Sequence, residues 1–103
     1  MRKVTKETVI AFLNKTSKKV GNTVVTVVDG ETALSLHGNI IALNKDGVIQ
    51  INNKGYETNT TKERLNGLLE MLDEPKIYQS NFSWYRDIDG VKTEFPYNEW
   101  VTI

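Results

Sequence analysis

The chain has 103 residues, balances 13 basic against 13 acidic side chains, and contains no cysteine. This length predicts one domain, 1–103, with its own core, and the lack of cysteine excludes disulfides and thiolate chemistry. Its 39% apolar and 25% charged residues are typical of an ordinary soluble protein, and no apolar run approaches the roughly 20 residues of a membrane-spanning helix.

The two signs of charge are unevenly distributed along the chain. Residues 1–20 carry six basic side chains and one acidic one, whereas residues 70–103 carry seven acidic and three basic ones. We therefore expect a dipolar molecule. The N-terminal residues are charged and then amphipathic, which does not fit a secretory signal, so we expect a cytoplasmic location.

A first helix is predicted over residues 5–17. Thr5 can cap its N-terminus, and Val9 and Phe12 recur at helical spacing. From Gly21 onward the pattern changes to short apolar runs separated by turn signals.

These runs predict an antiparallel meander of four strands over about 23–52. Two-residue loops at Asp29-Gly30 and Gly38-Asn39, and a three-residue loop ending at Gly47, place the apolar side chains on one sheet face. The face consists of Val25, Val27, Leu34, Leu36, Ile41, Leu43, Ile49 and Ile51.

A second helix is predicted over residues 61–73, where leucines recur at the i, i+3, i+4 and i+7 positions. Thr60 and Glu63 match a capping box, and Pro75 ends the helix. Gly67 lowers the helix propensity, and close approach of the helix to the sheet is one explanation.

A C-terminal β-hairpin is predicted over about 77–97, around an Asp89-Gly90 turn. This region holds most of the chain's aromatic residues. Pairing across the turn places Phe82, Trp84, Phe95 and Tyr97 on one packing face. It leaves outside that face Tyr78, Tyr85 and Trp100. The predicted fold class is therefore α+β, with two helices, a four-stranded meander and this hairpin.

The chemistry-bearing residues do not predict an enzyme. His37 is the only histidine and lies beside a turn in a chain without cysteine, so we expect neither a catalytic triad nor a three-histidine zinc site, and the carboxylates lack the spacing of a calcium loop. The glycines are scattered singly, which excludes a phosphate-binding loop. We expect no catalytic residue, no metal and no cofactor.

A chain without catalytic groups acts through its surface, and two kinds of partner remain open. The first is a protein, for which exposed aromatic side chains are typical contacts. The candidate contacts are Tyr78, Tyr85 and Trp100.

The alternative partner is a nucleic acid. Basic side chains near the N-terminus would contact phosphates, and the C-terminal aromatics would stack on bases with Arg86 between them. The candidate phosphate contacts are Lys15, Lys18 and Lys19.

Several short runs resemble a family of small tailed-bacteriophage proteins. The runs are Thr5-Lys6-Glu7-Thr8-Val9, Leu13-Asn14, Gly21-Asn22-Thr23, Leu36-His37-Gly38-Asn39-Ile40-Ile41-Ala42, Asn59-Thr60-Thr61-Lys62-Glu63-Arg64-Leu65-Asn66 and Asn98-Glu99-Trp100-Val101. The resemblance covers most of the chain and implies a phage origin and a host cytoplasm. It implies no activity and no site residues.

Overall fold

A computed structural model describes residues 1–103 as two helices and nine strands. The helices are α1 (Lys3–Leu13) and α2 (Asn59–Met71). The strands are β1 (Lys18–Val20), β2 (Thr23–Val28), β3 (Glu31–Leu36), β4 (Asn39–Lys45), β5 (Val48–Ile51), β6 (Tyr78–Ser80), β7 (Ser83–Ile88), β8 (Val91–Glu94) and β9 (Val101–Thr102). The predicted α+β class, with a meander, two helices and a C-terminal hairpin, is confirmed.

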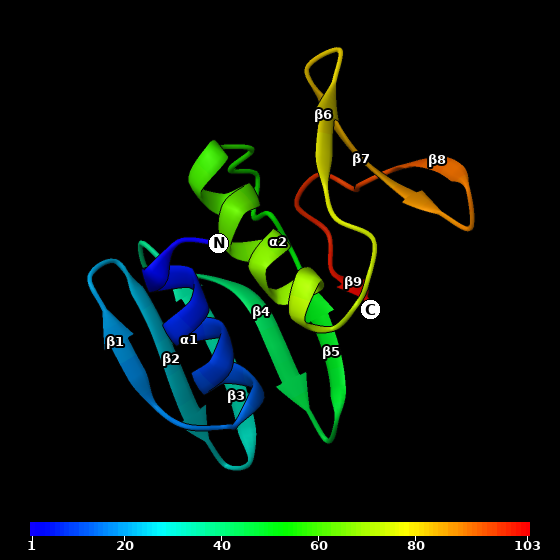
Figure 1. The fold of residues 1–103 in the computed structure, drawn as a ribbon. Helices are drawn as coiled ribbons and strands as arrows, with labels where there is room; N and C mark the ends of the chain where they lie inside the picture. The colour runs from blue at the N-terminus through cyan, green and yellow to red at the C-terminus, as the bar shows by residue number, and fades with distance from the viewer.

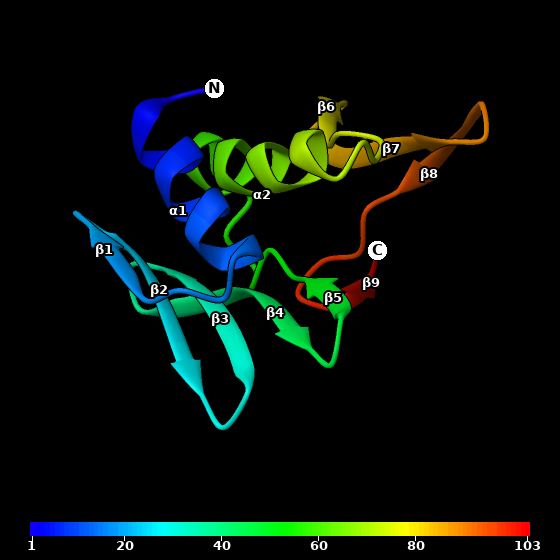
Figure 2. The same cartoon turned by 60° about the horizontal axis from the view of Figure 1, so that its bottom comes forward.

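The strands form two antiparallel sheets. The larger sheet has the order β1-β2-β3-β4-β5-β9, and the smaller has the order β6-β7-β8. Both helices lie over one face of the larger sheet, and the smaller sheet extends beyond α2, away from the meander (Figures 1 and 2). We call residues 78–94 the arm.

The first helix begins and ends earlier than the predicted 5–17. After Leu13, Lys15 has a left-handed φ of 55°, and the N–H of Thr16 donates to the carbonyl of Ala11, which closes the helix end. Thr5 is not the cap, because it lies inside α1 and is fully buried. Its hydroxyl donates instead to Glu63 of α2.

The strand β1 was not predicted. It pairs with β2 as an added edge strand of the larger sheet. The Lys18-Lys19-Val20 segment is too short and too polar to show an alternating pattern, so only the tertiary position reveals it.

The predicted pairing of β2 with β3 is confirmed, with Val25 opposite Leu34. The predicted pairing of β3 with β4 is wrong, because the turn is His37-Gly38, where both residues have positive φ. A register shift follows between Leu34 and Ser35. The loop between β4 and β5 is also one residue shorter than predicted, since Lys45 pairs with Val48.

These shifts change the predicted apolar face of the sheet. Leu43 pairs with Ala33 and Gln50 and therefore lies on the face away from the helices. Ile41 and its neighbour Ala42 are both buried, because the register shift accommodates an extra residue in β4. Val27, at the far end of β2, is exposed.

The second helix begins two residues before its predicted start. Thr58 is the N-cap, and its hydroxyl accepts a hydrogen bond from the N–H of Thr61 at 3.2 Å. The predicted capping box of Thr60 and Glu63 is absent, because Glu63 binds Arg64 and Thr5. Gly67 does mark a close approach, although to α1: a Cβ there would lie 2.2 Å from Thr5 Cγ2.

One apolar core joins the two sheets and the two helices. It contains Val9 and Phe12 of α1, and Leu65, Leu68 and Leu69 of α2, over the buried side chains of β2 to β5. From the arm and its flanks come Ile77, Trp84 and Phe95. The arm is therefore anchored at its base and free at its far end.

Candidate functional site

The base of the arm is held by two aromatic rings. Trp84 and Phe95 are 1% and 3% exposed, and their ring centroids lie 6.2 Å apart. The N–H of Phe95 donates to the carbonyl of Trp84 at 2.8 Å. The predicted pairs across the Asp89-Gly90 turn are confirmed from Ile88 opposite Val91 to Tyr85 opposite Glu94. The rings of Trp84 and Phe95 lie in the core, as predicted.

A buried arginine also fixes the arm to the end of α2. The Nε of Arg86 donates to the carbonyl of Pro75 at 2.8 Å, and its Nη2 lies 3.8 Å from Glu74. Burial lowers the pKa of Arg86, and the charge of Glu74 opposes that shift. Because only about 5% of Arg86 is exposed, it is not placed to stack between nucleic-acid bases.

The other half of the predicted packing face is exposed. Phe82 and Tyr97 are 92% and 65% exposed, so their assignment to the core is wrong. The strand β8 ends at Glu94, and β7 begins only at Ser83, which pairs with Ser80. The expected pairing of Phe82 with Tyr97 therefore does not form.

Phe82 occupies a left-handed position in a tight turn. Asn81 and Phe82 connect β6 to β7 with φ of 51° and 67°. Four other hairpin turns in the chain also have two consecutive positive φ values, and all four have glycine second. They are Asp29-Gly30, His37-Gly38, Asp46-Gly47 and Asp89-Gly90.

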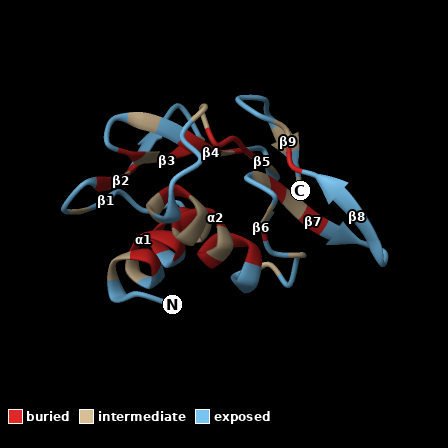
Figure 3. Cartoon of the chain, turned by 90° about the horizontal axis from the view of Figure 1, so that it is seen from above, coloured by how far each residue is buried: buried red, intermediate tan, exposed pale blue.

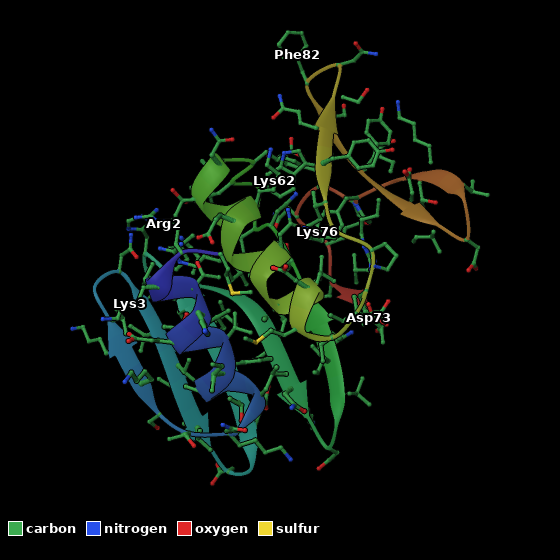
Figure 4. All side chains as sticks on the ribbon, viewed as in Figure 1. Arg2, Lys3, Lys62, Asp73, Lys76 and Phe82 are labelled. Atoms are coloured by element: carbon green, nitrogen blue, oxygen red, sulfur yellow. The ribbon has the colours of Figure 1, made fainter.

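Phe82 alone places a bulky side chain at this position, which L-residues with a Cβ rarely adopt. Its ring points away from the molecule at the end of the β6–β7 hairpin (Figure 4). Asn81, a residue that tolerates the left-handed region, was the only sequence signal for this turn.

Two of the sequence-predicted contact residues meet on the arm. Tyr78 of β6 lies opposite Tyr85 of β7, with ring centroids 6.1 Å apart. The Tyr78 hydroxyl donates to Asp87 Oδ1 at 2.6 Å, and this hydrogen bond raises the pKa of Tyr78 above its ordinary value. The two rings and the carboxylate therefore share one face of the arm.

Lys92 of β8 extends this cluster. Its Nζ lies 4.3 Å from the centroid of the Tyr85 ring and 3.2 Å from the hydroxyl of Ser80. A cation over an aromatic face restrains both side chains. This side of the arm is therefore an ordered aromatic and charged surface next to the Phe82 turn.

Trp100, the third predicted contact residue, lies outside the arm. It is 36% exposed, and the Nζ of Lys54 lies 5.0 Å from its ring. It precedes β9, whose Val101 pairs with Ile51 at the edge of the larger sheet. The structure thus joins Tyr78 to Tyr85 and places Trp100 beside a different loop.

The predicted phosphate contacts Lys15, Lys18 and Lys19 are all exposed. None belongs to a helix, because α1 ends at Leu13. Lys18 and Lys19 are consecutive residues of β1, so their side chains leave the strand on opposite sides. The three lysines therefore do not form one basic stripe.

A hollow of about 390 Å³ lies between the β3–β4 turn and the start of α2. Its lining comprises Leu36, His37, Asn39, Ile41, Tyr56, Thr58, Thr60 and Thr61. The lining includes an imidazole and hydroxyl groups without a carboxylate or an amine. His37 Nε2 lies 3.2 Å from Asn22 Nδ2, in an exposed turn.

The chain holds no group of three or more histidine, cysteine, aspartate or glutamate side chains arranged to bind a metal ion. Neither helix has the length and apolar composition that a membrane crossing requires.

Comparison with known proteins identifies the family to which this chain belongs. No curated protein and no solved structure matches the chain significantly. The family model described as "Kyanoviridae Gp96 protein" matches residues 1–102, which is nearly the whole chain. The phage origin that the short runs imply is thereby confirmed, and the chain belongs to the Kyanoviridae Gp96 family of cyanophage proteins.

Proposed function

We propose that this phage protein acts without catalysis, as a binding protein whose arm contacts a protein of the host or of the phage. The observation that carries the proposal is the exposure of the Phe82 side chain at a left-handed backbone position. An apolar ring that is 92% exposed gains nothing from folding, and its left-handed φ costs about 1–2 kcal/mol relative to ordinary backbone.

A partner with an apolar pocket supplies a reason for this arrangement. Burying a phenylalanine side chain contributes roughly 2–3 kcal/mol, which exceeds the backbone cost. Strained backbone at an exposed position is typical of binding sites. The Phe82 ring is therefore proposed as the anchor of the contact.

The neighbouring aromatic pair supports the same surface. Tyr78 and Tyr85 are held by each other, by Asp87 and by Lys92, so little side-chain entropy is lost when they are covered. Tyrosine is also enriched in protein interfaces. Trp100, beside Lys54, is proposed as a secondary contact, and the host cytoplasm is the proposed place of action.

Capture of partners from a cyanobacterial host lysate, before and after phage infection, tests this proposal. The test variant is Phe82→Gly, which removes the ring and relieves the backbone. The matched control is Tyr56→Ala, which removes an aromatic side chain that is 53% exposed and distant in sequence from the arm. We expect Phe82→Gly to lose the partner and Tyr56→Ala to keep it.

A second variant examines Tyr85 of the aromatic pair together with Trp100. Tyr85→Ala combined with Trp100→Ala, in a chain that keeps Phe82, should lower the amount of captured partner below that of the natural chain. An unchanged set of captured proteins in both this variant and Phe82→Gly, with the fold intact, would show that the arm is not the contact surface.

Nucleic-acid binding through Lys15, Lys18 and Lys19 is the alternative function. The burial of Arg86 and the opposite directions of Lys18 and Lys19 weigh against it. A salt titration of binding to single- and double-stranded DNA decides the matter, because phosphate contacts are strongest at low salt. Binding at low salt that is lost in a Lys15, Lys18 and Lys19 triple alanine variant would favour this alternative.

A further inference from the structure

The two sheets have four edge strands, which are β1 and β9 in the larger sheet and β6 and β8 in the arm. An edge strand exposes backbone N–H and C=O groups that can pair with another strand. Three of the four edges are short or protected.

Like charges protect the edge at β1. Its three residues include Lys18 and Lys19, and a second copy of the strand would bring their charges together. The strand β9 has only two residues, which is too short for a stable pairing.

A side chain of α2 shortens the free edge at β6 to the single outward-facing residue Gln79. Asn66 Oδ1 accepts from the N–H of Ile77 at 2.6 Å, and Asn66 Nδ2 donates to the carbonyl of Ile77 at 2.9 Å. Asn66 thus takes both hydrogen bonds that a neighbouring strand would make with the residue before β6.

The edge at β8 has no such protection. All four residues of β8 are exposed, and the strand lies at the rim of the molecule with no other element beside its outer edge (Figure 3). The exposed side chains include Val91, which is 62% exposed.

The pairing with β7 determines which backbone groups of β8 are free. Backbone groups in an antiparallel strand point alternately toward and away from the neighbouring strand. The N–H of Phe95 donates to Trp84 of β7, so Thr93 and Val91 also face β7. The N–H and C=O groups of Lys92 and Glu94 therefore point outward.

Two copies of β8 can pair antiparallel only in registers that bring the outward N–H and C=O groups of Lys92 or Glu94 in one copy opposite those of Lys92 or Glu94 in the other. One register sets Lys92 opposite Lys92 of the second copy, and another sets Glu94 opposite Glu94. The remaining register, centred on Thr93, sets each Lys92 opposite the Glu94 of the other copy. Only this register pairs opposite charges, and it does so twice.

We propose that two copies of this chain associate along β8, about a two-fold axis at Thr93. The paired arms form one continuous six-stranded sheet with four backbone hydrogen bonds across the junction, all from Lys92 and Glu94. This inference is independent of the proposed Phe82 contact.

The junction is short, so the association is weak. Two four-residue strands bury much less than the roughly 1,200 Å² of a standard interface. We expect a dissociation constant on the order of 0.1 mM at low ionic strength. Added salt should weaken it further, because the ion pairs lie at the surface.

Sedimentation equilibrium over a range of protein concentrations tests the proposal with two charge-reversed variants. Lys92→Glu creates four facing carboxylates, and Glu94→Lys creates four facing ammonium groups. Each variant alone should be monomeric, with a dissociation constant raised at least about tenfold. An equimolar mixture should associate, because each Glu of one variant then faces a Lys of the other.

Lys92 also contacts Tyr85 and lies opposite Asp87 within its own chain, so Lys92→Glu can loosen the hairpin. Glu94→Pro is therefore a second variant, since it removes an outward N–H that makes no bond to β7. Glu94→Pro should abolish association, while the NMR resonances of Tyr78 and Tyr85 remain those of the folded arm. Phe82→Gly should associate as the natural chain does.

Concentration-dependent association of the natural chain, lost in each single variant and restored in the mixture, supports the two-fold pairing. The proposal is overturned by a natural chain that stays monomeric at millimolar concentration. It is equally overturned if Glu94→Pro, folded, associates like the natural chain, or if the mixture of charge variants stays monomeric.

Discussion

Asn53 accepts a hydrogen bond on its side-chain oxygen from the backbone N–H of Asn98, 2.8 Å away. The same oxygen accepts from the N–H of Gly55 at 2.9 Å, and Asn53 Nδ2 donates to the carbonyl of Pro96 at 3.3 Å. One fully buried amide therefore ties the loop after β5 to the chain that returns from the arm.

Removing this amide should destabilise the whole domain. In Asn53→Ala, the N–H groups of Gly55 and Asn98 and the carbonyl of Pro96 lose their partner, and we expect the free energy of unfolding to fall by about 3 kcal/mol. Urea denaturation followed by tryptophan fluorescence measures the change. Glu57→Ala, at an exposed position of the following loop, should stay within about 0.5 kcal/mol of the natural chain. A loss below 1 kcal/mol in Asn53→Ala would mean that water replaces the amide.

Gly67→Ala should also be destabilising, although alanine is the better helix former. The new methyl group would lie 2.2 Å from Cγ2 of Thr5, whose hydroxyl is held by Arg64 and Glu63. We expect a loss of about 2 kcal/mol, because the steric cost exceeds the gain in helix propensity.

Thr5→Ser provides the matched partner for that substitution. It removes Cγ2 and keeps the hydroxyl, so combining it with Gly67→Ala should recover most of the lost stability. A double variant as unstable as Gly67→Ala alone would show that the methyl group of Thr5 is not what excludes a side chain at position 67.

Phe82→Gly should stabilise the isolated protein, which is unusual for the loss of a large apolar side chain. Glycine adopts the left-handed φ of 67° without strain, and the exposed ring contributes no buried surface. We expect a gain of about 1 kcal/mol, visible as a rise of roughly 4–8 °C in Tm. Asn81→Gly should gain less, because asparagine already tolerates this conformation. A lower Tm for Phe82→Gly would mean that the ring packs within the chain.

Tyr78 should ionise at a higher pH than an ordinary tyrosine. Its hydrogen bond to Asp87 is made by the protonated hydroxyl, so the folded pKa is raised. The stabilising effect of this bond is fully present below the unfolded pKa and is lost as the pH rises through the folded pKa. A titration of tyrosinate absorbance should show an ionisation above pH 10.0 that is absent from Tyr78→Phe.

Asp87→Asn checks the cause of that shift. It removes the carboxylate charge and weakens the acceptor, so the Tyr78 ionisation should move to lower pH. An unchanged titration curve in Asp87→Asn would assign the raised pKa to another source.

The sequence by itself determined the elements that depend on local periodicity, together with the two hairpins whose turns are Asp29-Gly30 and Asp89-Gly90. The α2 leucines, the Asp29-Gly30 hairpin and the Asp89-Gly90 hairpin follow from short-range patterns, since their side chains and dihedral preferences act within a few residues. Pairing across the Asp89-Gly90 turn sets Trp84 opposite Phe95, and this pairing predicted that both rings lie in the core.

The tertiary structure alone decided which exposed residues are available for contact. Phe82 shares an alternating pattern with Trp84, and only the return of β6 onto β7 turns it outward. Arg86 is charged in sequence, yet contact with Pro75 buries it. The edge at β8 is free because no other strand of the fold pairs with it. These outcomes depend on contacts between distant segments, whose energies no local pattern contains.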